Sequence, residues 1–480
     1  MEILFLSSEV QPWSKTGGLA DVAGALPQAL AQRGHRVTVV SPLYGGLDRS
    51  APTPVSIGRS VEVRMGDRPY VAEICEAKLG QVRWLFLRED GFFARRALYG
   101  EGGRDYPDNG LRFAFFSAAA LEAAAAVGSP PEIVHANDWQ TGPAIYLASR
   151  ARGGGARPGL VFTIHNLAYQ GLFPPNVLAE LGWPERLFNL HELEFHGSVS
   201  FLKAGAVYAD QLSTVSPNYA REIRQPEFGC GLDGLMRSLD GRLRGIVNGI
   251  DSSEWDPRRD RQLPAHFHAA DLAGKARCKV ALQKELGLPA LADRPLFTMV
   301  GRITPQKGHD LLLAVLDGPG RELLSRAQLA ILGSGDQGLE RALLAKARER
   351  PEALAVRVSF DEGLAHRLEA GGDFFLMPSR FEPCGLNQLY SLRYGALPIV
   401  RSTGGLADTV QDAAPDLSRG TGFAFRPPTP EALWEAIERA LAAYARPAAL
   451  LALRRAGMAQ DYSWEASSAR YEEMYRETSR

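Results

Sequence analysis

The first forty residues read MEILFLSSEVQPWSKTGGLADVAGALPQALAQRGHRVTVV, and they indicate the class of fold. The apolar run Ile3–Ser7 predicts a strand, and a Gly-rich loop separates it from a helix over about Leu19–Gln32. Gly34 is a stop signal for that helix, and Arg36–Val40 predicts a second strand. Buried strands that alternate with helices are typical of a parallel sheet in an α/β protein.

The same alternation extends along the chain and restarts after Asn248. Polar and Gly residues follow several of the expected strands, which marks the edge of an open α/β sheet where ligands bind. Further strands are expected at Glu132–Ala136, Gly159–Ile164, Gln211–Val215, Leu296–Val300, Gln328–Leu332, Ala355–Ser359, Asp373–Met377 and Leu397–Val400.

Size and composition limit the class of protein. A chain of 480 residues is too long for one core, so two or three domains are expected. The formal net charge of −1 gives no global field for nucleic acid or an anionic membrane. The four cysteines form no CxxC pair, the N-terminus does not resemble a secretory signal, and Glu122 interrupts the apolar stretch Ala118–Val127. We therefore expect a cytoplasmic protein without a disulfide framework, zinc site or membrane span.

One hexapeptide occurs twice, as Thr16–Asp21 and as Thr403–Asp408. Each copy lies where a strand is expected to give way to a helix. Its Gly-Gly step, Gly17-Gly18 or Gly404-Gly405, allows close approach of the backbone and directs N–H groups at an anion. Two such turns predict a diphosphate-bearing ligand held in a cleft between two similar lobes.

Three cations accompany these turns. Lys15 directly precedes the first Gly-Gly step, and Arg302 and Lys307 flank a turn between a buried strand and a helix. Ammonium and guanidinium groups at helix starts complement a phosphate that the helix dipole already favours. The alternatives are a solvated surface lysine for Lys15 and a basic surface loop for the other two.

Two further candidates follow strands. Glu382, crowded by Phe381, Pro383 and Cys384, is either a carboxylate that acts on a ligand or a helix-start glutamate that interacts with the dipole. Cys384 itself fits a small buried residue better than a nucleophile. His165 ends a strand, where a histidine is more often a packing residue than a base. HExxH, GxSxG and P-loop motifs are missing, and the Gly333-x-Gly335-x-x-Gly338 spacing is a weak dinucleotide signal.

Taken together, the motifs resemble those of bacterial glycogen synthases and plant starch synthases, nearly end to end. The segments that carry this resemblance, in chain order, are KTGGLADVAGALP, HANDWQTGPA, TIHNLAYQG, IVNGID, GRITPQKG, PSRFEPCGLNQLYSLRYG and STGGLADTV.

The resemblance implies a GT-B fold, with two Rossmann-like domains whose parallel sheets face each other across a deep interdomain cleft. The expected domains are 1–247 and 248–455, with a helical segment 456–480 that packs back on the first domain. It also implies a retaining hexosyltransferase of glycogen biosynthesis, which transfers glucose from ADP-glucose to the non-reducing end of an α-1,4-glucan and releases ADP. No cofactor and no metal ion are expected, the partners are donor and glucan, and oligomeric state stays open.

The resemblance assigns roles to residues that match the family motifs. It implies that Glu382, His165, Arg302, Lys307 and Lys15 are catalytic. The residues that it places at the donor are Lys15, Gly17, Gly18, Asn166, Arg302, Lys307, Phe360, Cys384, Gly385, Leu386, Thr403, Gly404 and Gly405. On the acceptor and glucosyl side it places Asp138, Trp139 and Asn248. Phe360 aligns with an adenine-stacking tyrosine and keeps the stacking face without the hydroxyl.

Two positions depart from related patterns. Gln140 replaces the usual histidine of Asp-Trp-His, which affects the acceptor side. Tyr390 stands where the wider retaining superfamily often has a second glutamate, as in glycogen synthases. The alternative functions are another GT-B transferase, using UDP-glucose or a small sugar acceptor, a glycan-binding protein with a decayed cleft, and, disfavoured by length and motifs, glycogen phosphorylase.

Overall fold

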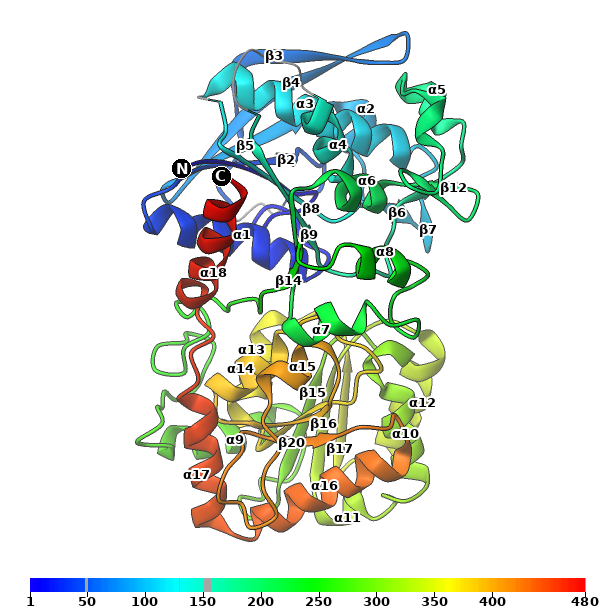
Figure 1. Ribbon diagram of the computed structural model, residues 1–480. Helices are drawn as coiled ribbons and strands as arrows, with labels where there is room; N and C mark the ends of the chain where they lie inside the picture. The colour runs from blue at the N-terminus through cyan, green and yellow to red at the C-terminus, as the bar shows by residue number, and fades with distance from the viewer. Residues whose placement is uncertain (48–50, 129, 151–156, 480) are drawn as a thin grey trace. The chain divides into compact units, whose positions relative to one another are not determined.

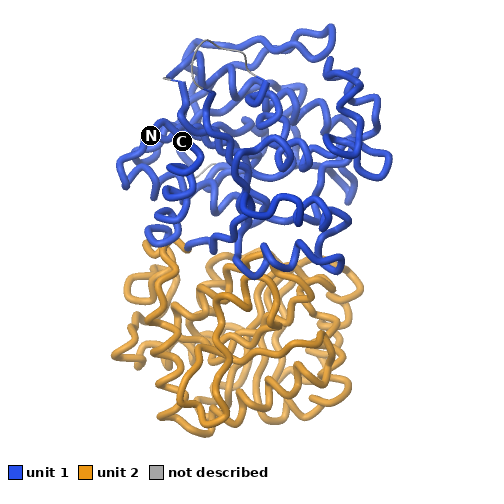
Figure 2. The backbone as a smooth tube through the Cα atoms, in the orientation of Figure 1, with its two compact units in different colours: residues 1–249, 464–480 blue, residues 250–463 orange. Residues whose placement is uncertain are grey.

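The structure is a computed structural model that describes residues 1–47, 51–128, 130–150 and 157–479. Its contacts divide the chain into unit 1, Met1–Gly249 with Trp464–Arg480, and unit 2, Ile250–Ser463 (Figure 2). Unit 1 thus includes the last helix. The C-terminal segment expected from the sequence began at residue 456, whereas residues 456–463 lie in unit 2.

A nine-stranded sheet forms the centre of unit 1, in the order β14-β13-β9-β8-β1-β2-β5-β4-β3 (Figure 1). Strands β14 to β5 of this order are parallel, and β4 and β3 extend the sheet as an antiparallel edge. The strands are β1 Glu2–Leu6, β2 Arg36–Pro42, β3 Val55–Met65, β4 Arg68–Leu79, β5 Val82–Arg88, β8 Ile133–Asn137, β9 Gly159–Ile164, β13 Gln211–Thr214 and β14 Leu243–Gly245. Smaller sheets pair β6 Gly100–Glu101 with β7 Arg104–Asp105, and β10 Leu172–Phe173 and β11 Glu194–Phe195 with β12 Ser198–Ser200.

Helices cover both faces of this sheet. Helices α1 and α18 lie together on one face, where Leu26 and Tyr471 pack in one core cluster with Phe5 and Val39 of the strands (Figure 1). Helices α3, α4 and α6 pack together on the other face. The helices are α1 Gly18–Gln32, α2 Asp90–Phe93, α3 Asn109–Val127, α4 Gly142–Arg150, α5 Val177–Leu181, η1 Glu185–Leu187, α6 Phe201–Tyr208, α7 Pro217–Glu222, α8 Asp233–Ser238 and α18 Trp464–Thr478.

Helix α3 is long and apolar enough, by length and composition alone, to cross a membrane. Of its apolar window, however, 61% is buried inside the unit. It packs against α4 and the sheet, as a core helix of a globular domain does.

Unit 2 contains a six-stranded, fully parallel sheet in the order β17-β16-β15-β18-β19-β20. Separate apolar clusters fill its two faces, one around Leu312 and Ile331 and the other around Leu282 and Leu332. The strands are β15 Leu296–Val300, β16 Gln328–Gly333, β17 Leu354–Val358, β18 Phe374–Met377, β19 Leu397–Arg401 and β20 Phe423–Phe425. The helices are α9 Ala273–Glu285, η2 Pro305–Lys307, α10 His309–Asp317, α11 Leu323–Arg326, α12 Gln337–Glu349, α13 Glu362–Gly371, α14 Asn387–Arg393, α15 Gly404–Thr409, α16 Pro430–Tyr444 and α17 Pro447–Met458.

Capping side chains fix where several helices begin. Asp336 accepts a hydrogen bond from the Leu339 N–H at the start of α12, and Asp361 accepts one from the Leu364 N–H at the start of α13. Such caps stabilise a helix by about 1 kcal/mol each.

The expected parallel strands are all present, with ends shifted by at most a few residues. Because β9, β8 and β1 are parallel neighbours, the loops after them meet at one edge of the unit 1 sheet; these loops carry Lys15, Asp138 and His165. The neighbours β15, β18 and β19 bring Arg302 and Glu382 to the corresponding edge of unit 2. The fold thus gathers the candidate residues of each unit at its ligand-binding edge.

Candidate active site

Lys15 lies in the exposed loop between β1 and α1. Its Nζ donates to Asp21 Oδ1 at 2.6 Å and to Gln11 Oε1 at 3.3 Å, and 36% of the side chain is exposed. An exposed ion pair of this kind contributes about 1 kcal/mol or less. The ammonium is therefore held near the start of α1 by a weak partner that an incoming phosphate could outcompete.

Glu9 is a buried carboxylate that hydrogen-bonds to the same loop, and it was not among the residues predicted from the sequence. Its Oε2 accepts hydrogen bonds from the Thr16 N–H at 2.5 Å and from Thr16 Oγ1 at 2.9 Å. Burial raises the pKa of Glu9 to about 7, against the opposing effect of these bonds. The Thr16 amide of the predicted anion-binding turn is thus already engaged by a protein group, and the Gly17 N–H interacts with the same carboxylate.

The Gly-Gly step of this first turn remains open. Gly17 and Gly18 are exposed, and a Cβ added at Gly17 would meet nothing within 4 Å. Gly17 also has an extended backbone, with φ −161°, that any residue could adopt. Since no side chain caps α1, its start has the space and the dipole to receive an anion.

The second copy of the hexapeptide is packed differently. A Cβ on Gly404, where φ is +45°, would lie 1.9 Å from the Glu382 carbonyl oxygen, and one on Gly405 would lie 2.1 Å from that of Cys384. The Gly405 N–H donates to the carbonyls of Glu382 at 3.1 Å and Pro383 at 3.0 Å. Thr403 is buried as well. Contrary to the sequence-based expectation, the Gly405 amide holds the Glu382 loop and is not directed at a ligand.

Lys307 and Glu382 form an ion pair in unit 2. Lys307 Nζ lies 2.6 Å from Glu382 Oε2, and Ser379 Oγ donates to the same oxygen at 3.1 Å. The Glu382 side chain is buried, whereas about a quarter of Lys307 is exposed. The structure therefore brings together the residue expected at the diphosphate and the one expected at the sugar.

Backbone contacts fix the geometry of this pair. The Arg380 N–H donates to the Gln306 carbonyl at 2.8 Å, so the loop after β18 is tied to the turn after β15. Gly308, with φ +80°, ends that turn where a Cβ would lie 2.2 Å from the Pro378 carbonyl. This position requires glycine for both conformation and space.

Arg302 is exposed in the same turn. Among the residues that the structure describes, its guanidinium has no hydrogen-bond or ion-pair partner. An exposed cation in the same turn as Lys307 is well suited to a diphosphate, which guanidinium binds bidentately.

Asp138 and His165 lie on neighbouring strand ends in unit 1. Asp138, with φ +58°, accepts a hydrogen bond from the His165 N–H at 2.7 Å, and burial raises its pKa to about 7. The His165 ring is buried, with Nε2 3.0 Å from Asn137 Oδ1. Burial lowers the pKa of His165 to about 3, so the imidazole is neutral at physiological pH and serves as a hydrogen-bonding group.

The other acceptor-side candidates differ in accessibility. Trp139 is 8% exposed and packs against Phe113 and Phe173, so its ring is chiefly part of the hydrophobic core. Asn248 is also buried, and its Oδ1 has no hydrogen-bond partner within the described ranges. Asn166, which was predicted on the donor side, is partly exposed and accepts a hydrogen bond from the Ala168 N–H. Asn248 thus has a free acceptor, whereas Trp139 has little free surface.

The remaining donor-side candidates follow β18 and β17. Cys384 is buried, Gly385 has φ +73°, and Leu386 is the N-cap residue of α14, where no side-chain cap is present. Phe360 is 86% exposed directly after β17. A phenyl ring that the protein leaves in solvent at a ligand-binding edge is available to stack on a planar ligand.

The Gly333-x-Gly335-x-x-Gly338 spacing has a structural explanation. A Cβ on Gly333 would lie 1.8 Å from the Gly301 carbonyl, and one on Gly335 would lie 2.3 Å from that of Ile303. The Gly335 N–H donates to Glu340 at 2.6 Å. Gly333 and Gly335 let the two loops pack closely. This packing explains the glycine spacing without a dinucleotide-binding role. In the described part of the chain, no group of three or more His, Cys, Asp or Glu residues could hold a metal ion.

Family models match both halves of the chain. A model described as "Starch synthase catalytic domain" matches residues 2–238, and one described as "Glycosyl transferases group 1" matches residues 287–451. The chain is 53% identical to a glycogen synthase of Anaeromyxobacter sp. (strain Fw109-5) and 49% identical to one of Myxococcus xanthus (strain DK1622). Each alignment covers 99% of both chains.

Solved structures resemble this chain over the same extent. The catalytic domain of starch synthase IV from Arabidopsis thaliana, bound to ADP and acarbose, is 32% identical with a TM-score of 0.91, and 99% of each chain is covered. Sucrose-phosphate synthase from Thermosynechococcus elongatus is 19% identical with a TM-score of 0.60 over 99% of this chain and 98% of its own, a likeness of fold alone.

Proposed function

Because this chain belongs to the glycogen synthase family, we propose that it transfers glucose from ADP-glucose to the non-reducing end of an α-1,4-glucan, with retention of anomeric configuration and release of ADP. The observation that carries this proposal is 53% identity over 99% of the chain. The starch synthase that resembles it over its full length was solved with ADP and acarbose, which supports the same donor and acceptor classes here.

The proposed chemistry begins at the diphosphate. As the glucosyl–phosphate bond breaks, negative charge grows on the departing ADP, and Lys15, Arg302 and Lys307 stabilise that charge. Such cations accelerate the reaction because they interact more strongly with the transition state than with the bound donor. In binding the diphosphate, Lys15 gives up an exposed ion pair with Asp21, and Lys307 gives up its pair with the buried Glu382.

Glu382 acts next to the sugar, where an oxocarbenium-like state develops positive charge. When Lys307 turns to the diphosphate, the Glu382 carboxylate keeps the hydrogen bond from Ser379. It can then stabilise the positive charge that develops on the sugar. Neutral His165 donates or accepts a hydrogen bond at the glucosyl group, and Asp138 and Asn248 serve the acceptor side. The acceptor 4-hydroxyl attacks from the face that ADP leaves, and the departing phosphate takes its proton.

Phe360 stacks on the adenine, and the backbone at Gly385 and Leu386 meets sugar hydroxyls. The reaction as proposed uses no metal ion, because the three cations supply the charge that a metal would otherwise provide. The protein is proposed to act in the cytoplasm.

The decisive experiment measures nucleotide release from ADP-glucose and UDP-glucose with glycogen as acceptor. We expect ADP release, together with incorporation of glucose into the glucan, at a much higher kcat/KM than UDP release. Faster UDP release would assign the chain to a different donor. Glycogen binding without nucleotide release from either donor would indicate a glycan-binding protein.

A further inference from the structure

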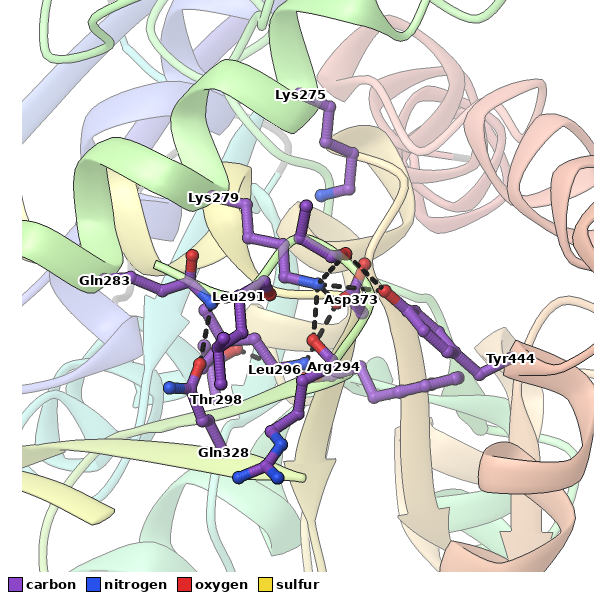
Figure 3. Close-up of polar contacts among 12 residues, drawn as sticks. Lys275, Lys279, Gln283, Leu291, Arg294, Leu296, Thr298, Gln328, Asp373 and Tyr444 are labelled. Carbon is purple, nitrogen blue, oxygen red and sulfur yellow. Dashed lines mark hydrogen bonds and ion pairs between the residues drawn. The ribbon is translucent and has the colours of Figure 1, made fainter. Parts of the chain in front are cut away.

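A second pocket lies in unit 2, at the amino ends of the strands and thus at the opposite edge of the sheet from Glu382. Its volume is about 690 Å³, within the range of small-molecule sites. Helices α9 and α17 and the end of α16 form its walls, and Arg454 is among the lining residues. Figure 3 shows four others, Lys275, Lys279, Asp373 and Tyr444.

Two cations in this pocket share one carboxylate. Asp373 Oδ2 lies 2.8 Å from Lys279 Nζ, and Asp373 Oδ1 lies 2.6 Å from Arg454 Nη2. Lys279 Nζ also donates to the Arg294 carbonyl at 2.6 Å and to Tyr444 Oη at 2.9 Å (Figure 3). The Arg454 Nε is buried and has no hydrogen-bond partner among the described residues. Arg454 therefore keeps donor capacity that Asp373 does not use.

Lys275 adds a third positive group without a carboxylate partner. It is 4% exposed, and its Nζ donates to the carbonyl oxygens of Glu369 at 3.3 Å and Ala370 at 2.9 Å. The Glu369 carboxyl accepts a hydrogen bond from Ser391 at 2.8 Å, and burial raises its pKa well above the usual range. Burial also lowers the pKa of Lys275 to about 7, so Glu369 does not hold this lysine in its charged form, and an anion beside it would favour the ammonium.

The balance of charge in the pocket lining is positive, since four basic residues, Lys275, Lys279, Arg326 and Arg454, accompany two acidic ones, Asp293 and Asp373. Burying an ammonium without a counter-ion is costly, and a purely structural role would be served by an apolar residue of similar size. An anionic ligand would supply the missing charge.

Much of the remaining wall is apolar. Four leucines and the Tyr444 ring contribute to it, the leucines being Leu272, directly before α9, Leu441 of α16, and Leu450 and Leu451 of α17. Such a wall accepts a small apolar or planar group next to the charged one.

We propose that this pocket is a second ligand site that binds a small organic anion, a phosphate monoester or a carboxylate, with its charged group at Lys275 and Arg454 and its apolar body against Tyr444 and the leucines. The site is separate from the nucleotide-sugar site, because Asp373 precedes β18 whereas Glu382 follows it.

Isothermal titration calorimetry on the full-length protein, with ADP in excess to occupy the donor site, tests the proposal. Phenyl phosphate and benzoate serve as the two anions, and benzyl alcohol as the neutral analogue. We expect saturable one-to-one binding of at least one anion and at least tenfold weaker binding of the alcohol. The stronger of the two anions identifies the charged group that the site prefers.

Three variants locate the site. Lys275→Met removes the unpaired charge, and Ala276→Glu places a carboxylate at the exposed rim of the pocket on the same helix; each should weaken anion binding about tenfold or more. Lys284→Met is the matched control, because Lys284 is exposed on α9 outside the lining, and it should leave binding unchanged. If Lys275→Met does not fold, the anion affinity of Ala276→Glu tests the proposal by itself. Absence of saturable anion binding in the wild type, or wild-type affinity in Ala276→Glu, would overturn the proposal.

Discussion

Replacing Gly405 with alanine tests whether the second hexapeptide holds the Glu382 loop in place. The new Cβ would lie 2.1 Å from the Cys384 carbonyl oxygen, whereas ordinary contacts begin at 3.4 Å. The two backbone segments would therefore have to separate by about 1.3 Å. Both are main chain, so no flexible side chain can absorb the clash.

The consequence of that shift is larger for turnover than for stability. Overpacking of this kind costs roughly 1–3 kcal/mol, which lowers the Tm of a unit of this size by roughly 2–12 °C. A displacement of about 1 Å at a catalytic group lowers the rate on the order of 10²-fold. We expect kcat for ADP release to fall by about that factor while the fold persists.

Gly17→Ala is the comparison variant, because it changes a glycine of the Gly-Gly step in the other copy of the hexapeptide, at the position equivalent to Gly404. Nothing lies within 4 Å of its Cβ position, and its φ of −161° suits alanine. We expect no measurable change in Tm, since the weaker helix cap and the smaller unfolded-state entropy offset each other. Differential scanning calorimetry and a coupled ADP-release assay measure both variants. A Gly405→Ala enzyme with wild-type Tm and kcat, or an equal loss of stability in Gly17→Ala, would refute the reasoning.

Three further predictions concern single side chains. Lys307→Ala should lower turnover by about 10²–10³-fold while far-UV circular dichroism stays native; an active variant would contradict the charge-neutralising role. Phe360→Ala should raise KM for ADP-glucose about fivefold, as loss of one stacking contact of about 1 kcal/mol implies, with Tm unchanged because the ring is 86% exposed; Phe360→Tyr should retain the wild-type KM, and equal KM values in all three proteins would exclude stacking. Glu9 has its pKa raised from 4.5 to about 7, so the native state binds the extra proton and loses up to about 3 kcal/mol of stability as pH rises from 4.5 through 7. Denaturation at pH 5 and pH 8 should show a smaller loss in Glu9→Gln than in the wild type, and identical losses would argue against a raised pKa.

The sequence predicted the parallel core of both units because buried strands appear as short apolar runs between helical patterns. It did not predict the antiparallel edge β3–β4 of unit 1. Along β3, Val61, Val63 and Met65 are buried whereas Glu62 and Arg64 are exposed. A half-exposed strand alternates apolar and polar residues and so lacks the continuous run that marked the others.

The sequence predicted where the candidate site residues lie in the fold better than it predicted which groups they contact. Strand ends located Lys15, Arg302 and Glu382, because parallel topology brings such ends to one edge. The different surroundings of the equivalent residues Gly17 and Gly404 could not be predicted, since identical residues pack against different neighbours. Glu9 was missed although it directly follows Ser7-Ser8 at a strand end, a polar cluster of the kind that indicated His165.

The last helix of the chain completes the first unit. In α18, Tyr471, Met474 and Tyr475 are fully buried against unit 1, and the Tyr475 hydroxyl lies 2.7 Å from Nδ1 of the buried His135. During synthesis on a ribosome, the N-terminal half emerges long before these residues exist. Its apolar face stays uncovered until α18 has been synthesised. A chaperone that shields that face should therefore raise the yield of soluble protein, and truncation of α18 should lower it.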